Sequence, residues 1–281
     1  MIRNVTFENK PLTLVGRNLQ IPRKAPNFTA VDNELREANL SSFGNRIKIF
    51  SFFLSHDTPV CDIQVREFNR RASTMTDDVV VIGISTDLPF AQKRFRETFN
   101  IRNMTLVSDY RYRSFGINYG VLIKEWNLLT RGVMIVDRIN TLRYVQITNE
   151  LANQPDYDET LDQLEEVIET PELSSSKGGN SECRENPPPL SSEAIQTMLP
   201  RHPGWELVGG NKLVKRYRLN SFADAKYYLD LFSVIAEEQK HHPSFLLNYG
   251  RLKVTLTTHS AEGLTENDFI MAEIIDEVVD V

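Results

Sequence analysis

The stretch IKIFSFFLSHDTPVC, residues 47–61, determines how the first half of this 281-residue chain folds. Its apolar run, residues 47–54, is typical of a strand that is buried on both faces of a sheet. Thr58 is a favourable N-cap residue, and Pro59 is favourable at the first helical position. The stretch therefore predicts a buried strand that leads into a helix, with Cys61 in the first turn of that helix.

The rest of residues 1–169 alternates between strand and helix patterns. The apolar runs that predict further strands lie at 79–84, 133–136 and 142–147, and the helical patterns lie at 90–99 and 157–168. Strands interleaved with helices are typical of a layered α/β domain. We therefore expect an α/β domain in residues 1–169.

The composition changes between residues 170 and 189, where Ser, Gly and Pro dominate and Leu173 is the one large apolar residue. A segment of this kind buries too little apolar surface to offset the entropy of ordering it. We interpret residues 170–189 as a flexible Ser/Gly/Pro linker that joins the first domain to a second one in residues 190–281.

The second domain has a different pattern. Its strand patterns lie at 205–208, 213–219, 245–249 and 252–258, and its helical patterns lie at 193–199, 221–239 and 265–278. The simplest arrangement is an α+β domain with one four-stranded antiparallel sheet and helices on one face.

The overall composition excludes several classes of protein. The net charge of −6 argues against a basic surface that binds nucleic acid or an anionic membrane. No apolar run is long enough to cross a bilayer, and the N-terminal residues lack the apolar core of a secretory signal. Two cysteines exclude a disulfide scaffold and a cysteine-rich zinc site. We expect a cytoplasmic protein without metal or other cofactor.

Cys61 is the first candidate for chemistry. The unpaired N–H groups and the dipole at a helix N-terminus favour a thiolate over a thiol. Cys61 shares one helical face with Val65, Phe68 and Ala72, so its sulfur is predicted to point inward. A thiolate in a partly enclosed niche is a nucleophile or a redox centre, and a buried structural cysteine is the alternative that these residues leave open.

Several motifs in residues 3–168 resemble the thiol peroxidase branch of the peroxiredoxins. They are PNFT (26–29), DTPVCD (57–62), STDLPFAQKRF (85–95), SDYR (108–111), YGVLI (119–123) and NQPDY (153–157). The resemblance implies a thioredoxin-like fold. It also implies that Cys61 attacks a peroxide oxygen, that Thr58 hydrogen-bonds the peroxide, and that Arg131 supports the negative charge of the thiolate and the transition state.

The chain departs from this family at two positions. Leu54 stands where the family has a proline, and Arg96 stands where the family has its resolving cysteine. A sulfenic acid at Cys61 then has three fates, which are reduction by thioredoxin or another external thiol, pairing with Cys183, or loss of turnover. Cys183 is thus a candidate resolving cysteine, and an incidental exposed cysteine is the alternative reading.

Histidines gather in the second domain. His241 and His242 follow the long predicted helix, whose dipole favours their protonation, and alternation places His259 on the polar face of the strand at 252–258. Together with Asp268 they suit general acid–base catalysis. A zinc site is the rival interpretation, but residues 190–281 contain no cysteine and adjacent histidines cannot share one helical face.

Residues 190–279 resemble pterin-4a-carbinolamine dehydratase through EEQKHHP (237–243), Tyr249, His259 and Asp268, with support from GWEL (204–207). The resemblance implies dehydration of 4a-hydroxytetrahydrobiopterin to the quinonoid dihydropterin without a metal. It assigns binding and acid–base roles to three histidines, with Asp268 orienting them. These histidines are His241, His242 and His259, and the substrate-binding residues are Glu237, Pro243 and Tyr249.

The two resemblances together predict a bifunctional, homo-oligomeric fusion enzyme whose partners are small-molecule substrates and a thiol reductant. The alternative is an active dehydratase whose peroxiredoxin-like domain has lost turnover and serves as a redox sensor or an assembly module.

Overall fold

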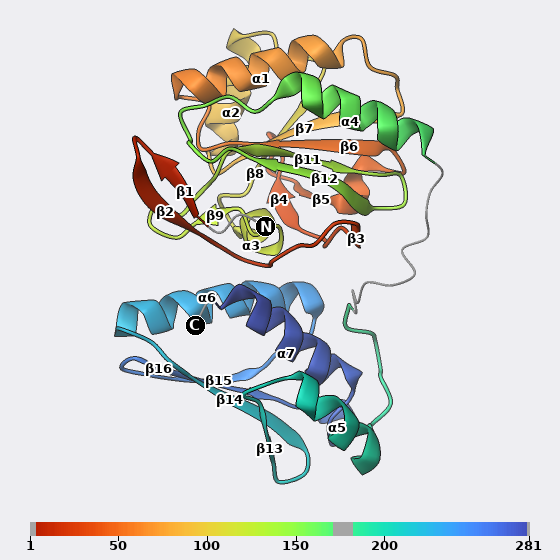
Figure 1. The fold of residues 1–281 in the computed structure, drawn as a ribbon, viewed down its shortest axis with the longest axis vertical. Helices are drawn as coiled ribbons and strands as arrows, with labels where there is room; N and C mark the ends of the chain where they lie inside the picture. The colour runs from red at the N-terminus through yellow and green to blue at the C-terminus, as the bar shows by residue number, and fades with distance from the viewer. Residues whose placement is uncertain (1–3, 171–181, 280–281) are drawn as a thin grey trace. The chain divides into compact units, whose positions relative to one another are not determined.

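The computed structural model describes residues 4–170 and 182–279, and the chain divides into two compact units, residues 1–180 and 181–281 (Figure 1). Residues 171–181 of the expected linker lie outside the described residues. Among the described residues, none of the helices is both long and apolar enough to cross a membrane.

The first unit is built on an eight-stranded sheet with the order β3-β12-β11-β6-β7-β8-β4-β5. The central strands β6, β7 and β8 are parallel, and β11 runs antiparallel to β6. Every residue of β6 is buried, as its apolar run predicted. The strands are β3 (Arg23–Lys24), β4 (Thr29–Val31), β5 (Glu37–Asn39), β6 (Ile47–Phe52), β7 (Val79–Ser85), β8 (Thr105–Ser108), β11 (Gly132–Val136) and β12 (Thr141–Ile147).

A smaller sheet, with the order β1-β2-β9-β10, completes the strands of this unit. Its strands are β1 (Asn4–Phe7), β2 (Lys10–Val15), β9 (Leu122–Ile123) and β10 (Leu128–Leu129), and the helices of the unit are η1 (Leu40–Phe43), α1 (Pro59–Ala72), α2 (Pro89–Thr98), α3 (Ser114–Asn118) and α4 (Tyr157–Glu169).

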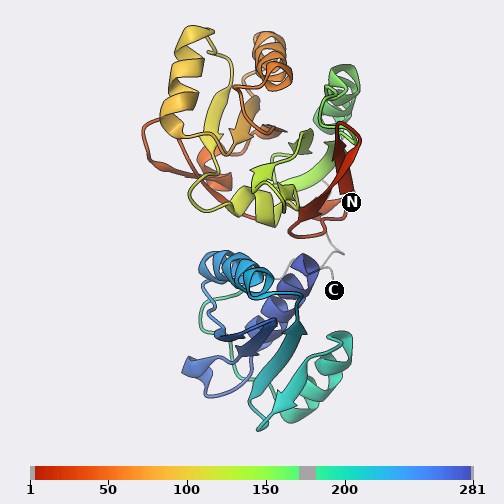
Figure 2. The same cartoon turned by 90° about the vertical axis from the view of Figure 1, so that its left-hand side faces the viewer.

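The alternation of β6 separates the helices between the two faces of the large sheet. Ser51 points to α1, where its hydroxyl accepts a hydrogen bond from Gln64, whereas Phe50 and Phe52 contact Phe115 of α3. α4 lies on the same side as α1 (Figures 1 and 2), and their contact includes the rings of Phe68 and Tyr157 at 5.3 Å. The predicted α/β domain is confirmed. The loop after the carboxyl end of β6 leads directly into α1.

Gly132, the first residue of β11, lies between two neighbouring strands. A Cβ at this position would lie 2.2 Å from the carbonyl oxygen of Gln146 and 2.6 Å from the ring of Phe52. We expect Gly132→Ala to lower the free energy of unfolding by about 1–3 kcal/mol, because the strand pairing must shift. Chemical denaturation measures this change. The matched control is Gly263→Ala, where the nearest atom lies 3.8 Å away and the change should stay within about 0.5 kcal/mol.

The second unit contains one four-stranded antiparallel sheet with the order β13-β14-β16-β15. α6 and α7 cover one face of this sheet (Figures 1 and 2), which confirms the predicted α+β domain. Its elements are α5 (Ser192–Met198), η2 (Leu199–Arg201), β13 (Glu206–Val208), β14 (Lys212–Arg218), α6 (Phe222–Gln239), β15 (Ser244–Asn248), β16 (Arg251–Leu256), η3 (His259–Ala261) and α7 (Glu266–Val278).

One strand differs from its prediction. β16 ends at Leu256, and His259 instead begins the short helix η3. The strand stops because the chain turns back on itself, with the N–H of Thr258 donating to the carbonyl oxygen of Gly263 at 2.9 Å. His259 is exposed at this turn, so its side chain is not placed by strand alternation.

Candidate active sites

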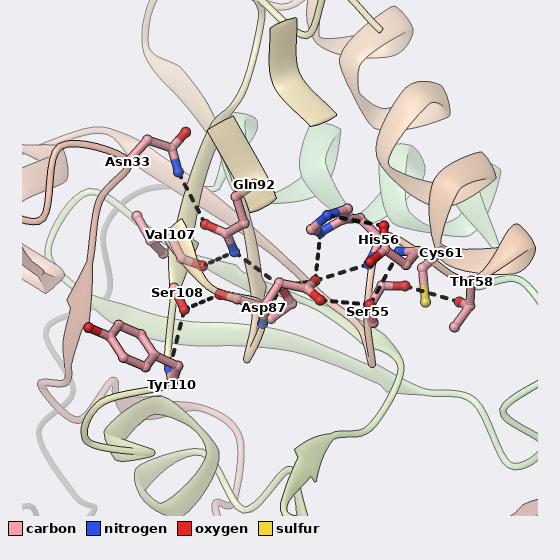
Figure 3. Close-up of polar contacts among 12 residues, drawn as sticks. Asn33, Ser55, His56, Thr58, Cys61, Asp87, Gln92, Val107, Ser108 and Tyr110 are labelled. Atoms are coloured by element: carbon pink, nitrogen blue, oxygen red, sulfur yellow. Dashed lines mark hydrogen bonds and ion pairs between the residues drawn. The ribbon is translucent and has the colours of Figure 1, made fainter. Parts of the chain in front are cut away.

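The first candidate site is centred on Cys61, at the start of α1. Thr58 is the N-cap and Pro59 opens the helix, as predicted, and the sulfur of Cys61 is completely buried. The side chain of Thr58 does not cap the helix. Its hydroxyl donates instead to the carbonyl oxygen of Ser55 at 3.0 Å (Figure 3). The lone pairs of this hydroxyl therefore remain available to accept a hydrogen bond from a ligand.

Arg131 is brought to Cys61 from the residue before β11. Its Nη2 donates to Cys61 Sγ at 3.2 Å, its Nη1 to Gln64 Oε1 at 2.7 Å, and its Nε to the carbonyl oxygen of Leu151 at 3.0 Å. The guanidinium is buried, and these three bonds fix its orientation. A permanent positive charge is thus held directly against the sulfur, where it favours negative charge.

Gln64 belongs to this site, although the sequence did not single it out. Its amide is fully buried and donates from Nε2 to Ser51 Oγ at 2.9 Å, while its carbonyl oxygen accepts from Arg131. The signal in the sequence is an amide three residues after Cys61 on an otherwise apolar helical face. Gln64 connects the cation to the central strand and so helps to orient it.

A further connection reaches the first turn of α1 from the start of α4. Gln154 donates from Nε2 to the carbonyl oxygen of Val60 at 2.8 Å, and the hydroxyl of Tyr157 donates to Gln154 Oε1. Burial raises the pKa of Tyr157, so its phenol stays protonated and remains a donor. These contacts hold the segment that precedes Cys61.

The two departures from the thiol peroxidase motifs are both visible in the structure. Leu54 is buried next to the loop that leads to α1. Arg96 lies in the last turn of α2, where its Nε donates to the carbonyl oxygen of Ile101 at 3.3 Å. The position expected for a resolving cysteine therefore carries a guanidinium, which binds the backbone just after the end of α2.

Cys183 lies on the second unit, inside the segment expected to be a linker. Its N–H donates to Gln239 Oε1 at 3.0 Å, and its sulfur lies 3.7 Å from the carbonyl oxygen of Asn267. Burial, with a contribution from the charge of Asp268, raises the pKa of the Cys183 thiol to about 12. In this position the thiol is protonated near neutral pH, which makes it a weak nucleophile.

The second candidate site is centred on His241 and Asp268. α6 ends at Gln239, and the left-handed backbone of the C-cap residue Lys240 redirects the chain. The buried His241 then places Nε2 at 2.8 Å from Asp268 Oδ1. Asp268, in the first turn of α7, is fully buried. The carboxylate favours a proton on Nε2 of the imidazole and leaves Nδ1 for exchange with a ligand.

The other oxygen of Asp268 is held by two threonines that the sequence did not single out. Asp268 Oδ2 accepts from Thr258 Oγ1 and from the N–H of Thr265, each at 2.8 Å. The contact with Thr265 has the spacing of a capping box, a signal that was present in the sequence as Thr-x-x-Asp. One carboxylate thus begins α7 and orients His241.

The remaining predicted residues are more exposed. His242 places Nε2 at 3.3 Å from Glu237 Oε1, and Tyr249 is 78% exposed at the turn between β15 and β16. Within residues 182–279, no hydrogen bond or ion pair joins His259 or Tyr249 to His241 or His242. Among the predicted residues, the structure therefore pairs His241 with Asp268 and His242 with Glu237. Pro243 follows them in the loop before β15. Among the described residues, no three His, Cys, Asp or Glu side chains are grouped as metal ligands.

The hydroxyl of Thr258 can be tested without disturbing the shape of the site. We expect Thr258→Val to lower the free energy of unfolding by about 1–3 kcal/mol, because it leaves a buried carboxylate oxygen with one donor fewer. Chemical denaturation measures the loss. The matched control is the neighbouring Thr257→Val, whose hydroxyl bonds to the carbonyl oxygen of Asn211 at the surface. Equal losses in the two variants would contradict the prediction.

Comparison with known proteins finds a family model for each unit. A model of the AhpC/TSA family matches residues 21–145, and a model of pterin 4 alpha carbinolamine dehydratase matches residues 188–278. The thiol peroxidase of Oceanobacillus iheyensis is 41% identical over 161 residues, which cover 57% of this chain and 98% of that protein.

Two solved structures are also similar. A peroxiredoxin-like protein from Aquifex aeolicus is 38% identical with a TM-score of 0.57, over 60% of this chain and 99% of its own. A transcriptional coactivator/pterin dehydratase from Brucella melitensis is 30% identical with a TM-score of 0.31, over 32% of this chain and 97% of its own.

The fold and the similar proteins define the first unit as a peroxiredoxin with a thioredoxin-like fold, and the family model defines the second as a pterin dehydratase domain. More narrowly, the chain belongs to the thiol peroxidase family and carries a pterin-4a-carbinolamine dehydratase domain fused after it. The predicted fusion is confirmed.

Proposed function

We propose that this protein is a bifunctional enzyme. Its first unit reduces hydrogen or alkyl peroxides through Cys61 at the expense of a thiol. Its second unit dehydrates 4a-hydroxytetrahydrobiopterin to the quinonoid dihydropterin. The observation that supports the first reaction most strongly is the buried Arg131 guanidinium at 3.2 Å from Cys61 Sγ. For the second reaction it is the buried pair of His241 and Asp268.

In the first reaction the sulfur of Cys61 attacks one peroxide oxygen, and the O–O bond breaks. Cys61 becomes a sulfenic acid, so the sulfur loses two electrons, and the second oxygen leaves as water or an alcohol after taking up a proton. Arg131 stabilises the negative charge that moves from the sulfur to the departing oxygen. Thr58, whose proton is directed to Ser55, accepts the hydrogen bond of the peroxide.

Regeneration of Cys61 requires a second thiol. We propose that thioredoxin or another external thiol attacks the sulfenic sulfur, releases water and forms a mixed disulfide, which a further thiol then reduces. Arg96 supplies no sulfur, and the protonated Cys183 is poorly suited to this attack. These two residues favour a mechanism with one protein cysteine over resolution by Cys183.

Intact-mass measurement of the reduced protein after one equivalent of hydrogen peroxide tests this mechanism, with Cys61→Ser and Cys183→Ser as controls. We expect the addition of one oxygen atom, retained in Cys183→Ser and absent from Cys61→Ser. Loss of two hydrogens that either substitution abolishes would instead assign resolution to Cys183. An unreactive Cys61 would overturn peroxide reduction and favour an assembly role for the first unit over a redox sensor.

In the second reaction the 4a-hydroxyl group leaves as water. One group must protonate the departing hydroxyl, another must accept a proton from the pterin ring, and no electrons are exchanged. His241 can exchange a proton at Nδ1 because Asp268 holds Nε2, and the exposed His242 and His259 are proposed to complete the acid–base set. Absorbance of a synthetic 4a-hydroxytetrahydropterin follows the reaction, and a rate equal to the uncatalysed one would contradict it.

A further inference from the structure

A partly buried polar cluster lies beside Thr58, and the steps described above do not use it. This Asp87 cluster consists of Ser55, His56, Ser85 and Asp87, of which Figure 3 labels Ser55, His56 and Asp87. Asp87 Oδ1 accepts from Ser55 Oγ at 2.6 Å. Asp87 Oδ2 accepts from Ser85 Oγ at 2.7 Å and from the N–H of His56 at 3.0 Å, and His56 Nδ1 lies 2.6 Å from the same oxygen.

The carboxylate at the centre of this cluster is charged. Burial opposes the ionisation of Asp87, but its interactions with His56, Ser55 and Ser85 outweigh burial and hold the pKa of the carboxyl below its ordinary value. The imidazole of His56 is buried as well, and its ring centroid lies 4.8 Å from that of Phe95 in α2. A largely enclosed carboxylate with this number of donors has one well-defined orientation.

The cluster is connected to the rigid part of the first unit. Ser85 ends β7, and its hydroxyl also accepts from Gln92 Nε2 at 3.0 Å. Gln92 in turn donates to the carbonyl oxygen of Val107 in β8 at 3.0 Å and accepts from Asn33 Nδ2 at 3.2 Å (Figure 3). The central sheet thus fixes the place of Asp87.

On its other side the cluster reaches the peroxide-binding hydroxyl through a single residue. The carbonyl oxygen of Ser55 accepts both the hydroxyl and the N–H of Thr58, each at 3.0 Å. Asp87 holds the side chain of the same Ser55 and the backbone of His56. A shift of Ser55 would therefore redirect the Thr58 hydroxyl without touching the sulfur or Arg131.

We propose that Asp87 and His56 are positioning residues of the peroxidase site, which hold Ser55 so that the Thr58 hydroxyl donates to Ser55 and presents its lone pairs to the peroxide. This inference rests on peroxide reduction by Cys61. It separates two properties of the site, because Arg131 controls the charge on the sulfur while the Asp87 cluster controls the recognition of the peroxide.

The test compares two reactions of Cys61 in the full chain, oxidation by hydrogen peroxide and alkylation by iodoacetamide. In Asp87→Asn and His56→Phe we expect the rate constant for peroxide to fall about 10–100-fold, because a small misplacement of a reacting group has an effect of this size. The rate constant for alkylation, which does not need Thr58, should not fall. The matched control is Asp77→Asn, an exposed carboxylate of the same unit outside the cluster, which should retain both rates.

A double-mutant cycle with Thr58→Val tests whether Asp87 acts through Thr58. If it does, Asp87→Asn changes the peroxide rate by less than about twofold once the Thr58 hydroxyl is absent, since the two effects are not additive. An unreactive wild-type Cys61 would refute peroxide reduction itself. If the wild-type Cys61 reacts, three results would refute the positioning role alone. These are a peroxide rate that Asp87→Asn leaves unchanged, additive effects in the cycle, and a parallel loss of both reactions.

Discussion

Arg131→Met is expected to slow the reaction of Cys61 with hydrogen peroxide by about 10²–10³-fold, the effect of removing one preorganised donor from a developing negative charge. The guanidinium is the charged group that contacts the sulfur, at 3.2 Å, and it lies in a buried site where water does not screen it. Methionine fills a similar volume without the charge, so the pocket keeps its shape. Stopped-flow fluorescence or competition with a second peroxidase measures the rate constant.

The same substitution also affects stability, and the two effects must be separated. Gln64 Oε1 and the carbonyl oxygen of Leu151 each lose a donor, which costs about 1–3 kcal/mol for a buried group. A matched control is Arg138→Met, which removes an arginine of the same unit that pairs with Asp78 at the surface. Folded Arg131→Met protein with the rate of the wild type would show that the guanidinium does not act on the sulfur.

The local geometry around Cys61 could be predicted because the determining residues are neighbours in the chain. An apolar run followed by Thr58 and Pro59 specifies a buried strand, an N-cap and a first helical turn, whatever the rest of the molecule does. The strand pattern of the second domain likewise predicted its sheet. The end of β16 was not predicted correctly. The hydrogen bond from Thr258 to Gly263 that closes the turn leaves no signal in the alternation of apolar and polar residues.

The residues that orient the sites could not be predicted in the same way. Gln64 and Arg131 are 67 positions apart, and the contact of Ser55 with Asp87 spans 32 positions, so only the folded sheet brings them together. The position of Cys183 could not be predicted for the same reason. Its neighbours have the composition of a linker, but the groups that bind it, Gln239 and Asn267, come from distant helices.

Asp268→Asn is expected to lower the kcat of pterin dehydration by about 100-fold or more, the contribution of one positioned acid–base group. Asparagine keeps an oxygen that can accept from Thr258 and from the N–H of Thr265, so the start of α7 is retained. Its amide then faces His241 Nε2, where the carboxylate stood. Two N–H groups cannot share this contact, so the imidazole must change its tautomer or its orientation.

A second carboxylate on α7 supplies the matched control. Asp276 accepts hydrogen bonds from Trp205 Nε1 at 2.9 Å, Lys215 Nζ at 2.7 Å and the hydroxyl of Tyr217 at 2.9 Å, so Asp276→Asn also disturbs a connected carboxylate of the same helix. We expect that variant to lose stability but to keep the kcat of dehydration within about threefold of wild type, since none of its partners orients a histidine. Cys61 belongs to the other unit, so the rate of its reaction with peroxide should stay unchanged in both variants. If Asp276→Asn lowered kcat as much as Asp268→Asn, the loss would reflect the stability of α7 rather than the orientation of His241.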